Sequence, residues 1–256
     1  MLGSEVGQRH PAWTGSGDNT DMKSSPFEVS VVDDELQVLQ SFVRLQGLEV
    51  LELGCGPAEM ARRLVSMGTG CRVSALEVDE RQHAKNLERP ADGITFVCAG
   101  AQAIPFEADR FDLAWMLKSL HHVPLSLMDT ALSEIHRVLK PDGLLYVGEP
   151  VFAGELNDVM RLFHDEQAVR RAAYEAITRA VDSGRWVSVR EITFDMPVAF
   201  RDFADFERRM VNVTFLDHRL SEALRQRVRQ AFERHMGADG ARFLRPMRVN
   251  LLRKAV

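Results

Sequence analysis

Cysteine is scarce in this sequence, and its spacing is uninformative. The 256 residues contain three cysteines, Cys55, Cys71 and Cys98, and no CxxC pair. An odd count without ligand spacing disfavours a disulfide framework or a structural zinc site, and it is typical of a reducing compartment. We therefore expect a cytoplasmic protein.

Long apolar runs and basic runs are also missing. No stretch is apolar enough to span a bilayer, and the first residues are polar rather than a hydrophobic signal segment. The 32 Lys and Arg are outnumbered by 37 Asp and Glu, and they form no basic stripe of the kind that binds nucleic acid. We expect neither a membrane nor a nucleic-acid partner, and the sequence leaves the oligomeric state open.

The composition divides the chain into a tail and one domain. Residues 1–25 are polar and rich in glycine and serine, so we expect a disordered tail there. Residues 26–256 suit a single domain, because single hydrophobic cores stop growing near ~250–300 residues.

Short apolar segments alternate with amphipathic segments between residues 33 and 150. Continuously apolar strands between helices indicate a parallel sheet that is covered on both faces. The sequence therefore predicts an α/β fold with a doubly wound, mostly parallel sheet. The expected strands are 50–53, 72–76, 94–98, 111–116 and 143–147, and the expected helices lie at 33–46, around 60–65, from about 79, and at 128–139.

Beyond residue 150 the pattern becomes mainly helical. Residues 151–183 are helical with a break at 164–166, and two further helices are expected near 202–212 and 218–236. Residues 186–200 and 247–252 are expected to be strands. We expect the helical segments 151–183 and 202–236 to form a lid, and we expect the charges at 164–166 to face water.

A glycine turn follows the first strand, at Gly54-Cys55-Gly56. Glycines let the backbone approach a ligand closely, and the following helix supplies free N–H groups. The dinucleotide fingerprint needs glycine or alanine at its sixth position, where this chain has Glu59. Together with the acidic Glu52 before the turn, this favours a cationic ligand over a pyrophosphate.

Several motifs in this order resemble the class I S-adenosylmethionine-dependent methyltransferases, in the branch that includes ubiquinone-type enzymes. The resemblance covers roughly residues 48–150 and implies a Rossmann-like fold with S-adenosylmethionine as cofactor. The motifs are Glu52-Leu53-Gly54-Cys55-Gly56-Pro57-Ala58, Glu77, Ile104-Pro105-Phe106, Phe111-Asp112-Leu113, Leu120-His121-His122-Val123 and Leu139-Lys140-Pro141-Asp142-Gly143.

The resemblance also implies roles in cofactor binding. Glu52 is expected to face the cofactor's ammonium, and the backbone of residues 54–56 to line its methionine part. Glu77 is expected to accept both ribose hydroxyls, since one carboxylate has several acceptor sites. Other interpretations remain open, because Glu77 could be a surface acid and Glu52 a satisfied buried carboxylate.

Two hydrophobic residues complete this side of the predicted site. The resemblance implies that Val78 packs on adenine and that Met116, at the end of the fourth strand, lies near the methionine moiety. Asp79 is better explained as a helix cap than as a ligand.

The sequence departs from the family pattern at two places. Ala58 replaces a glycine, which is tolerable if this residue is already helical. Gly100 replaces the aspartate that accepts a hydrogen bond from the adenine amino group in relatives. The N–H of Ala101 can still reach the ring, and Gln102 could substitute for the aspartate.

Residues after the fourth and fifth strands face the reaction in such a sheet, because ligands bind at the carboxyl ends of the strands. His121 is the candidate general base, or else a structural residue at a helix start. Lys118 either holds an anionic part of the acceptor or extends to solvent. If the turn between them is helical, the two side chains share a face. We expect no metal, because His121 and His122 lack a nearby third ligand in the sequence.

The sequence thus predicts transfer of a methyl group from S-adenosylmethionine to a small-molecule acceptor. Two alternatives remain, namely a protein that uses the cofactor in non-methylating chemistry and a non-catalytic regulatory protein. The missing aspartate at Gly100 favours the last of these.

Overall fold

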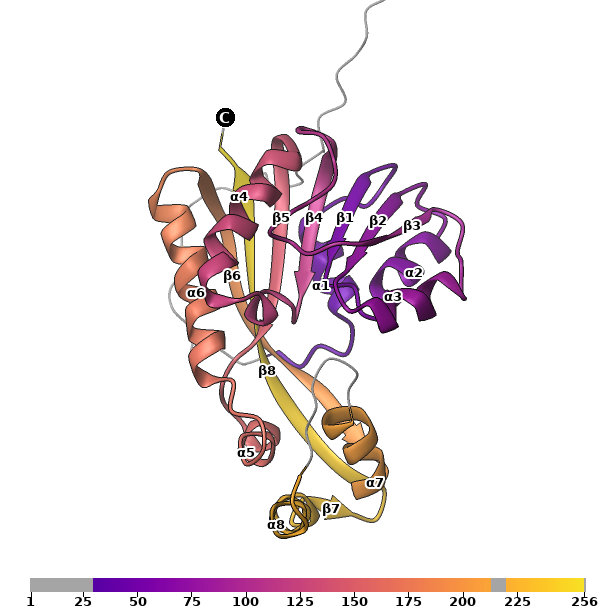
Figure 1. The fold of residues 1–256 in the computed structure, drawn as a ribbon, viewed down its shortest axis with the longest axis vertical. Coiled ribbons are helices and arrows are strands. Elements are labelled where there is room, and N and C mark those ends of the chain that lie inside the picture. Colours follow the sequence, from indigo (N-terminus) through magenta and orange to yellow (C-terminus); the bar gives the residue numbers. More distant parts are fainter. Residues whose placement is uncertain (1–29, 213–219, 256) are drawn as a thin grey trace, which may run out of the picture.

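Eight strands pair into one mixed sheet in this computed structural model, which describes residues 30–212 and 220–255 (Figure 1). Their order is β3-β2-β1-β4-β5-β8-β6, with β7 paired to β8. The strands are β1 (Glu49–Leu53), β2 (Arg72–Glu77), β3 (Ile94–Cys98), β4 (Phe111–Leu117), β5 (Leu139–Pro150), β6 (Trp186–Phe200), β7 (Met236–Gly237) and β8 (Gly240–Lys254). The predicted tail, 1–25, lies outside the described residues.

The first five strands are parallel, as the sequence predicts. β8 runs antiparallel to both β5 and β6. The carboxyl ends of β1, β2, β4 and β5 therefore meet at one edge of the sheet, where ligands bind in open α/β sheets.

Helices cover both faces of the sheet, which confirms the doubly wound architecture. One core joins α1 (Glu35–Phe42) and α2 (Glu59–Ser66) to one face of the sheet through residues such as Leu39, Leu64 and Trp115. A second core joins α4 (Met128–Val138) and α6 (Gln167–Asp182) to the other face. The helix α3 (Glu80–Leu87) contacts β2 and β3.

The position of α6 corrects part of the predicted lid. Ala173, Ala176 and Ile177 of α6 are buried in the same core as α4 and the sheet. This helix is therefore part of the layer that covers the sheet, because its apolar stripe needs that surface. The break before it, at 164–166, is confirmed.

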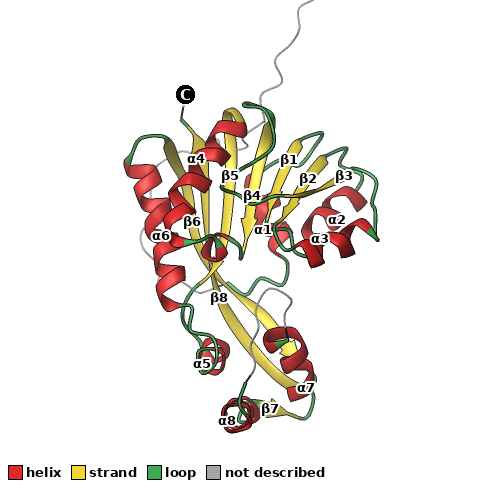
Figure 2. Ribbon diagram, viewed as in Figure 1, coloured by secondary structure: helices red, strands yellow, loops and turns green. Residues whose placement is uncertain are grey.

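The strands β6 and β8 continue past the sheet as a two-stranded ribbon. β8 pairs with β5 only over Met247–Arg253, whereas it pairs with β6 from Ala241 to Lys254. Figure 2 shows α5 (Glu155–Met160), α7 (Phe203–Phe206) and α8 (Glu222–Glu233) around this ribbon, below the sheet. A third core, which includes Phe200, Phe206 and Phe232, joins the ribbon and these three helices into a second lobe.

Short segments complete the chain between these elements. They are the 3-10 turns η1 (Leu120–His122) and η2 (Leu125–Leu127) and the π-helical segment η3 (Glu207–Val211). Within residues 30–212 and 220–255, no helix has both the length and the hydrophobicity that crossing a membrane would require.

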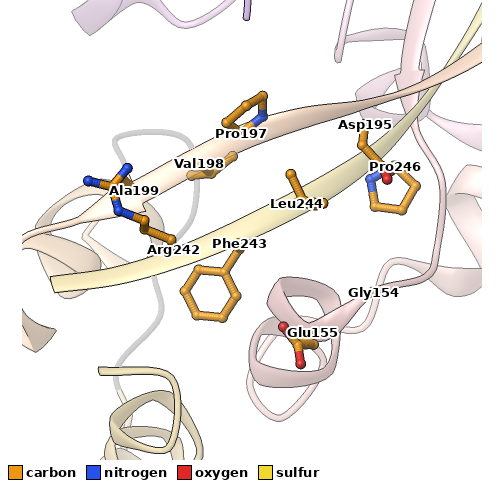
Figure 3. Close-up of a pocket in the computed structure, with 10 residues that line it drawn as sticks. All are labelled: Gly154, Glu155, Asp195, Pro197, Val198, Ala199, Arg242, Phe243, Leu244 and Pro246. Carbon is orange, nitrogen blue, oxygen red and sulfur yellow. The ribbon is translucent and has the colours of Figure 1, made fainter. Parts of the chain in front are cut away.

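A pocket of about 420 Å³ lies on the ribbon, where side chains of β6 and β8 meet the start of α5 (Figure 3). Pro197, Phe243 and Pro246 give it apolar walls, and Glu155 lies at its side. None of its lining residues belongs to β1, β2, β4 or β5. The pocket is therefore separate from the carboxyl ends of the parallel strands.

Candidate active site

The turn after β1 has a backbone that requires glycine. Gly54 has φ +67° and Gly56 has φ +51°, which L side chains rarely adopt. A Cβ on Gly54 would also lie 2.7 Å from the Cβ of Ser119, so the loop after β4 packs directly on this turn. A Cβ on Gly56 would meet nothing within 4 Å. The turn thus lacks space for a side chain at Gly54 and has such space at Gly56.

Polar side chains from β2 and α3 hold the turn in place. Glu77 ends β2 and accepts hydrogen bonds from the backbone N–H of Gly56 at 2.7 Å and of Asp79 at 2.9 Å. The side chain of Asn86 donates to the carbonyl of Gly56 at 2.7 Å. Asp79 caps α3, as expected, by accepting from Arg81 N. No sequence signal pointed to Asn86, because a single asparagine in a polar helix does not reveal its burial.

The chain leaves β4 through a left-handed residue, Lys118, with φ +57°. Its ammonium lies 2.7 Å from a carboxylate oxygen of Glu35, on α1. Because Lys118 is left-handed, the turn does not meet the condition under which Lys118 and His121 would share a helical face. Lys118 contacts the helix α1 on one face of the sheet, whereas His121 contacts Glu166 beside α6 on the other.

His121 is buried between two carboxylates, with 4% of its surface exposed. Its Nδ1 bonds to Glu149, and its Nε2 lies 3.5 Å from Oε1 of Glu166. Burial lowers the pKa of His121, but the two carboxylates outweigh it and raise this pKa to about 9. The role of His121 as a base stays a prediction, and these contacts favour the structural interpretation.

Glu166 departs from the expectation that residues 164–166 face water. It is 6% exposed, and its carboxylate lies 2.8 Å from His164 Nε2 and 2.5 Å from Arg170. Burial alone would raise the pKa of Glu166, but the charges of His121 and Arg170 hold it well below its usual range. The sequence missed this site because the contact joins residues 45 positions apart.

Comparisons with known proteins connect this geometry to a family. A family described as "Methyltransferase domain" matches residues 51–147. Methyltransferase GfsG from Streptomyces halstedii is 32% identical over 117 residues, 44% of this chain and 41% of that protein. The ubiquinone/menaquinone biosynthesis C-methyltransferase UbiE from Allorhizobium ampelinum is 35% identical over 112 residues, 40% of this chain and 42% of that protein.

Among solved structures, a SAM-dependent methyltransferase from Methanosarcina mazei is similar in fold, with a TM-score of 0.56 and 15% sequence identity. The structural match covers 88% of this chain and 100% of that chain. This likeness confirms the Rossmann-like fold. Residues 51–147 therefore match the methyltransferase-domain family, and the relatives agree with the expected class I S-adenosylmethionine-dependent methyltransferase and its cofactor.

The match has clear limits along the chain. The alignments with GfsG and UbiE span about two fifths of the length of those relatives. The family match ends at residue 147. The helices α5 and α6 and the second lobe therefore lie outside the methyltransferase domain as the family defines it.

The methyltransferase domain has an unsatisfied buried carboxyl at the position expected for the cofactor's ammonium. Glu52 is 4% exposed, and its Oε2 has no hydrogen-bond partner among the described residues. Burial raises the pKa of Glu52 to about 8, and the charge of Glu77 adds to this effect. A cationic group beside this oxygen would supply the missing partner, so Glu52 fits the cofactor.

The turn contributes its backbone rather than its thiol. Cys55 is buried, and this burial raises the pKa of its thiol, which disfavours a reactive role. Gly54 is exposed, so the backbone of the turn is accessible there. Both observations fit the predicted contact of residues 54–56 with the cofactor's methionine part.

The predicted adenine side also has the required surfaces. Val78 is 66% exposed directly after Glu77, and its apolar side chain could be covered by a ring. A Cβ on Gly100 would lie 2.5 Å from Oε1 of Gln102, so the amide of Gln102 occupies the space beside Gly100. This placement fits the predicted substitution by Gln102. Ala101 is buried at 8% exposure.

Ala58 does not behave as the sequence suggests, and Met116 is buried. Ala58 has φ 57° and ψ 37° as the N-cap of α2, so it is left-handed and not yet helical. The chain adopts this conformation because it must turn sharply from the glycine turn into α2. Met116 is 1% exposed in the core shared with α4, and its contact with the cofactor stays a prediction.

Proposed function

We propose that this protein transfers the methyl group of S-adenosylmethionine to a small-molecule acceptor. The observation that carries the proposal is the carboxylate of Glu77. It bridges Gly56 N and Asp79 N at the end of β2. A carboxylate has about four lone-pair positions, so two remain for the hydroxyls of a ribose.

When bound, S-adenosylmethionine supplies a methyl group that is already activated on a sulfonium. The chain therefore needs to hold the donor, align the acceptor and exclude water. Glu52 and the turn at 54–56 hold the methionine end, and Glu77 holds the ribose. The acceptor approaches from the ends of β4 and β5, where Lys118 and His121 stand.

The acceptor-side roles follow from the contacts of these two residues. The side chain of Lys118 is 32% exposed and paired with Glu35, so it can meet an anionic part of the acceptor without leaving its partner. His121 is held by carboxylates at both ring nitrogens. Because both nitrogens are engaged, His121 in this proposal fixes the loop after β4 on the acceptor side, and the activated donor supplies the driving force.

The test combines donor binding with turnover. Calorimetry with S-adenosylhomocysteine is compared between wild type, Glu77→Gln and the control Glu80→Gln, which changes a nearby acid on α3. We expect Glu77→Gln to weaken binding by about 1.5–3 kcal/mol, because charge-assisted bonds to the diol are lost. The control should bind as wild type does.

Turnover is then followed as release of S-adenosylhomocysteine with pools of small acceptors. Release that depends on an added acceptor supports methyl transfer. Tight donor binding without release from any pool would favour the regulatory alternative. Equal affinity in wild type and a folded Glu77→Gln variant would remove Glu77 from the donor site.

A further inference from the structure

Three potential metal ligands converge beside the end of β4. One ligand atom each from His121, His122 and Glu166 lies within 4.8 Å of the other two. The rings of His121 and His122 have centroids 4.1 Å apart and are tilted by 43°. The sequence expectation of no metal rested on the lack of a third ligand, and Glu166 supplies one.

The surroundings of His121 match those of a metal-binding histidine. Its Nδ1 is bonded to Glu149, which in turn accepts from the backbone N–H of Ser119 at 3.2 Å and of Leu120 at 2.8 Å. Histidine ligands usually donate one ring nitrogen to a carboxylate, which fixes the ring and leaves the other nitrogen for the metal. Here that other nitrogen, Nε2, is the one that faces Glu166.

The carboxylate of Glu166 is also held in place by its neighbours, as a metal ligand would be. One of its oxygens accepts from Arg170 at 2.5 Å, and Arg170 contacts the side chain of Asn157 at 3.2 Å. The other oxygen, Oε1, faces both His121 and His164. The carboxylate is thus anchored on one side and directed toward the imidazoles on the other.

We propose that His121, His122 and Glu166 bind one divalent transition-metal ion. Imidazole and carboxylate together suit Zn²⁺, Co²⁺ and Fe²⁺ better than Mg²⁺ or Ca²⁺. Two ligands that are ~2.0–2.1 Å from a tetrahedral ion lie roughly 3.3 Å apart. The 3.5 Å between His121 Nε2 and Glu166 Oε1 is close to this value.

The site adjoins the glycine turn through Ser119. The hydroxyl of Ser119 donates to the carbonyl of Leu53 at 2.8 Å, and His121 follows two residues later. Three protein ligands would leave a coordination position open, as in catalytic rather than structural metal sites. The inference concerns metal binding alone and does not depend on the proposed function.

The test uses Co²⁺ as the probe, added to full-length protein that has first been stripped with a chelator. We expect one equivalent to bind, with a visible absorption band from nitrogen and oxygen ligands. Glu166→Gln and His122→Gln should abolish the band. Glu149→Gln should weaken binding about 10–100-fold, because it removes only the support of His121. The control His83→Gln, on α3, should behave as wild type.

The rival interpretation is a network of hydrogen bonds that holds a proton instead of a metal. Absence of the Co²⁺ band in wild type, or an unchanged band in His122→Gln, would overturn the proposal. His122 is exposed, so this variant keeps the test valid even if Glu166→Gln fails to fold. Affinity for S-adenosylhomocysteine, measured on the same samples, separates failure of the metal site from failure of the proposed function.

Discussion

Glu52 carries a carboxyl group that the fold buries without pairing it fully. Its pKa of about 8 lies above the ordinary value of 4.5, so the folded protein keeps a proton there that the unfolded chain loses. The stability that this proton provides is complete below about pH 4.5 and is lost as the pH rises through about 8. The folded protein is therefore more stable when Glu52 is neutral than when Glu52 is charged.

We predict that Glu52→Gln flattens the pH dependence of stability, since glutamine has no proton to lose. The ligand-free variant should be more stable than wild type at pH 8 and similar to it at pH 4.5. The measurement is the free energy of unfolding by urea across this range. If the free energy of unfolding changed with pH by the same slope in both proteins, Glu52 would ionise normally.

Gly100 is absent from the described residues with positive φ, and its Cβ would meet only the tip of a flexible side chain. We predict that Gly100→Asp folds, displaces Gln102 and tightens S-adenosylmethionine binding by about 0.5–1.5 kcal/mol, the net value of one hydrogen bond. Calorimetry on this variant, with Gln102→Ala as a control, checks the prediction. Looser binding in a folded Gly100→Asp protein would mean that adenine is held differently here.

Residue positions that depend on local spacing could be predicted from the sequence. The glycine turn, Glu77 and Asp79 stand at or just after the ends of strands, so their places at the sheet edge come from the strand pattern. Asn86 and Glu166 could not be predicted, because their burial depends on how distant helices pack. The left-handed conformation of Ala58 was missed because alanine gives no sign of positive φ.

At the scale of elements, the type of each segment was easier to predict than its position. The pattern of 151–183 predicts helices, and helices are present, but only packing places α6 on the sheet. The last strand was predicted at 247–252 and observed over Gly240–Lys254. Its first half was missed because the ribbon there leaves the sheet and loses the continuous apolar pattern.

Gly240 determines where the ribbon can turn. It has φ +94°, and a Cβ there would lie 2.3 Å from the carbonyl oxygen of Phe200. We predict that Gly240→Ala destabilises the protein by more than about 2 kcal/mol, because backbone strain and a clash with a backbone oxygen combine. Urea unfolding checks this, with Gly184→Ala as a control that has positive φ but open space. Equal losses in both variants would show that the clash is relieved without cost.

At the scale of the whole molecule, the cofactor residues and the phenylalanine core occupy different regions. Glu52 and Glu77 belong to the parallel sheet, whereas the third core lies on the ribbon and its helices. A ligand that contacts only the first region should stabilise that region most.

We predict that S-adenosylhomocysteine slows hydrogen exchange around residues 52–58 and 76–80 more than around 222–243. Its binding should also raise the free energy of unfolding by ~2.7 kcal/mol at a concentration of 100 times Kd. Exchange followed by mass spectrometry measures the first effect, and thermal unfolding measures the second. Equal protection of both regions would mean that the ligand also orders the second lobe.

The order of strands has a consequence for how the protein is made. β8 follows β6 in the sequence but lies between β5 and β6 in the sheet. During synthesis the edge of β5 that will pair with β8 therefore has no neighbour until residues 240–254 have left the ribosome. An open strand edge can pair with other chains. Ribosome-stalled chains that lack these residues should aggregate or recruit chaperones, because this edge of β5 stays open until β8 is inserted.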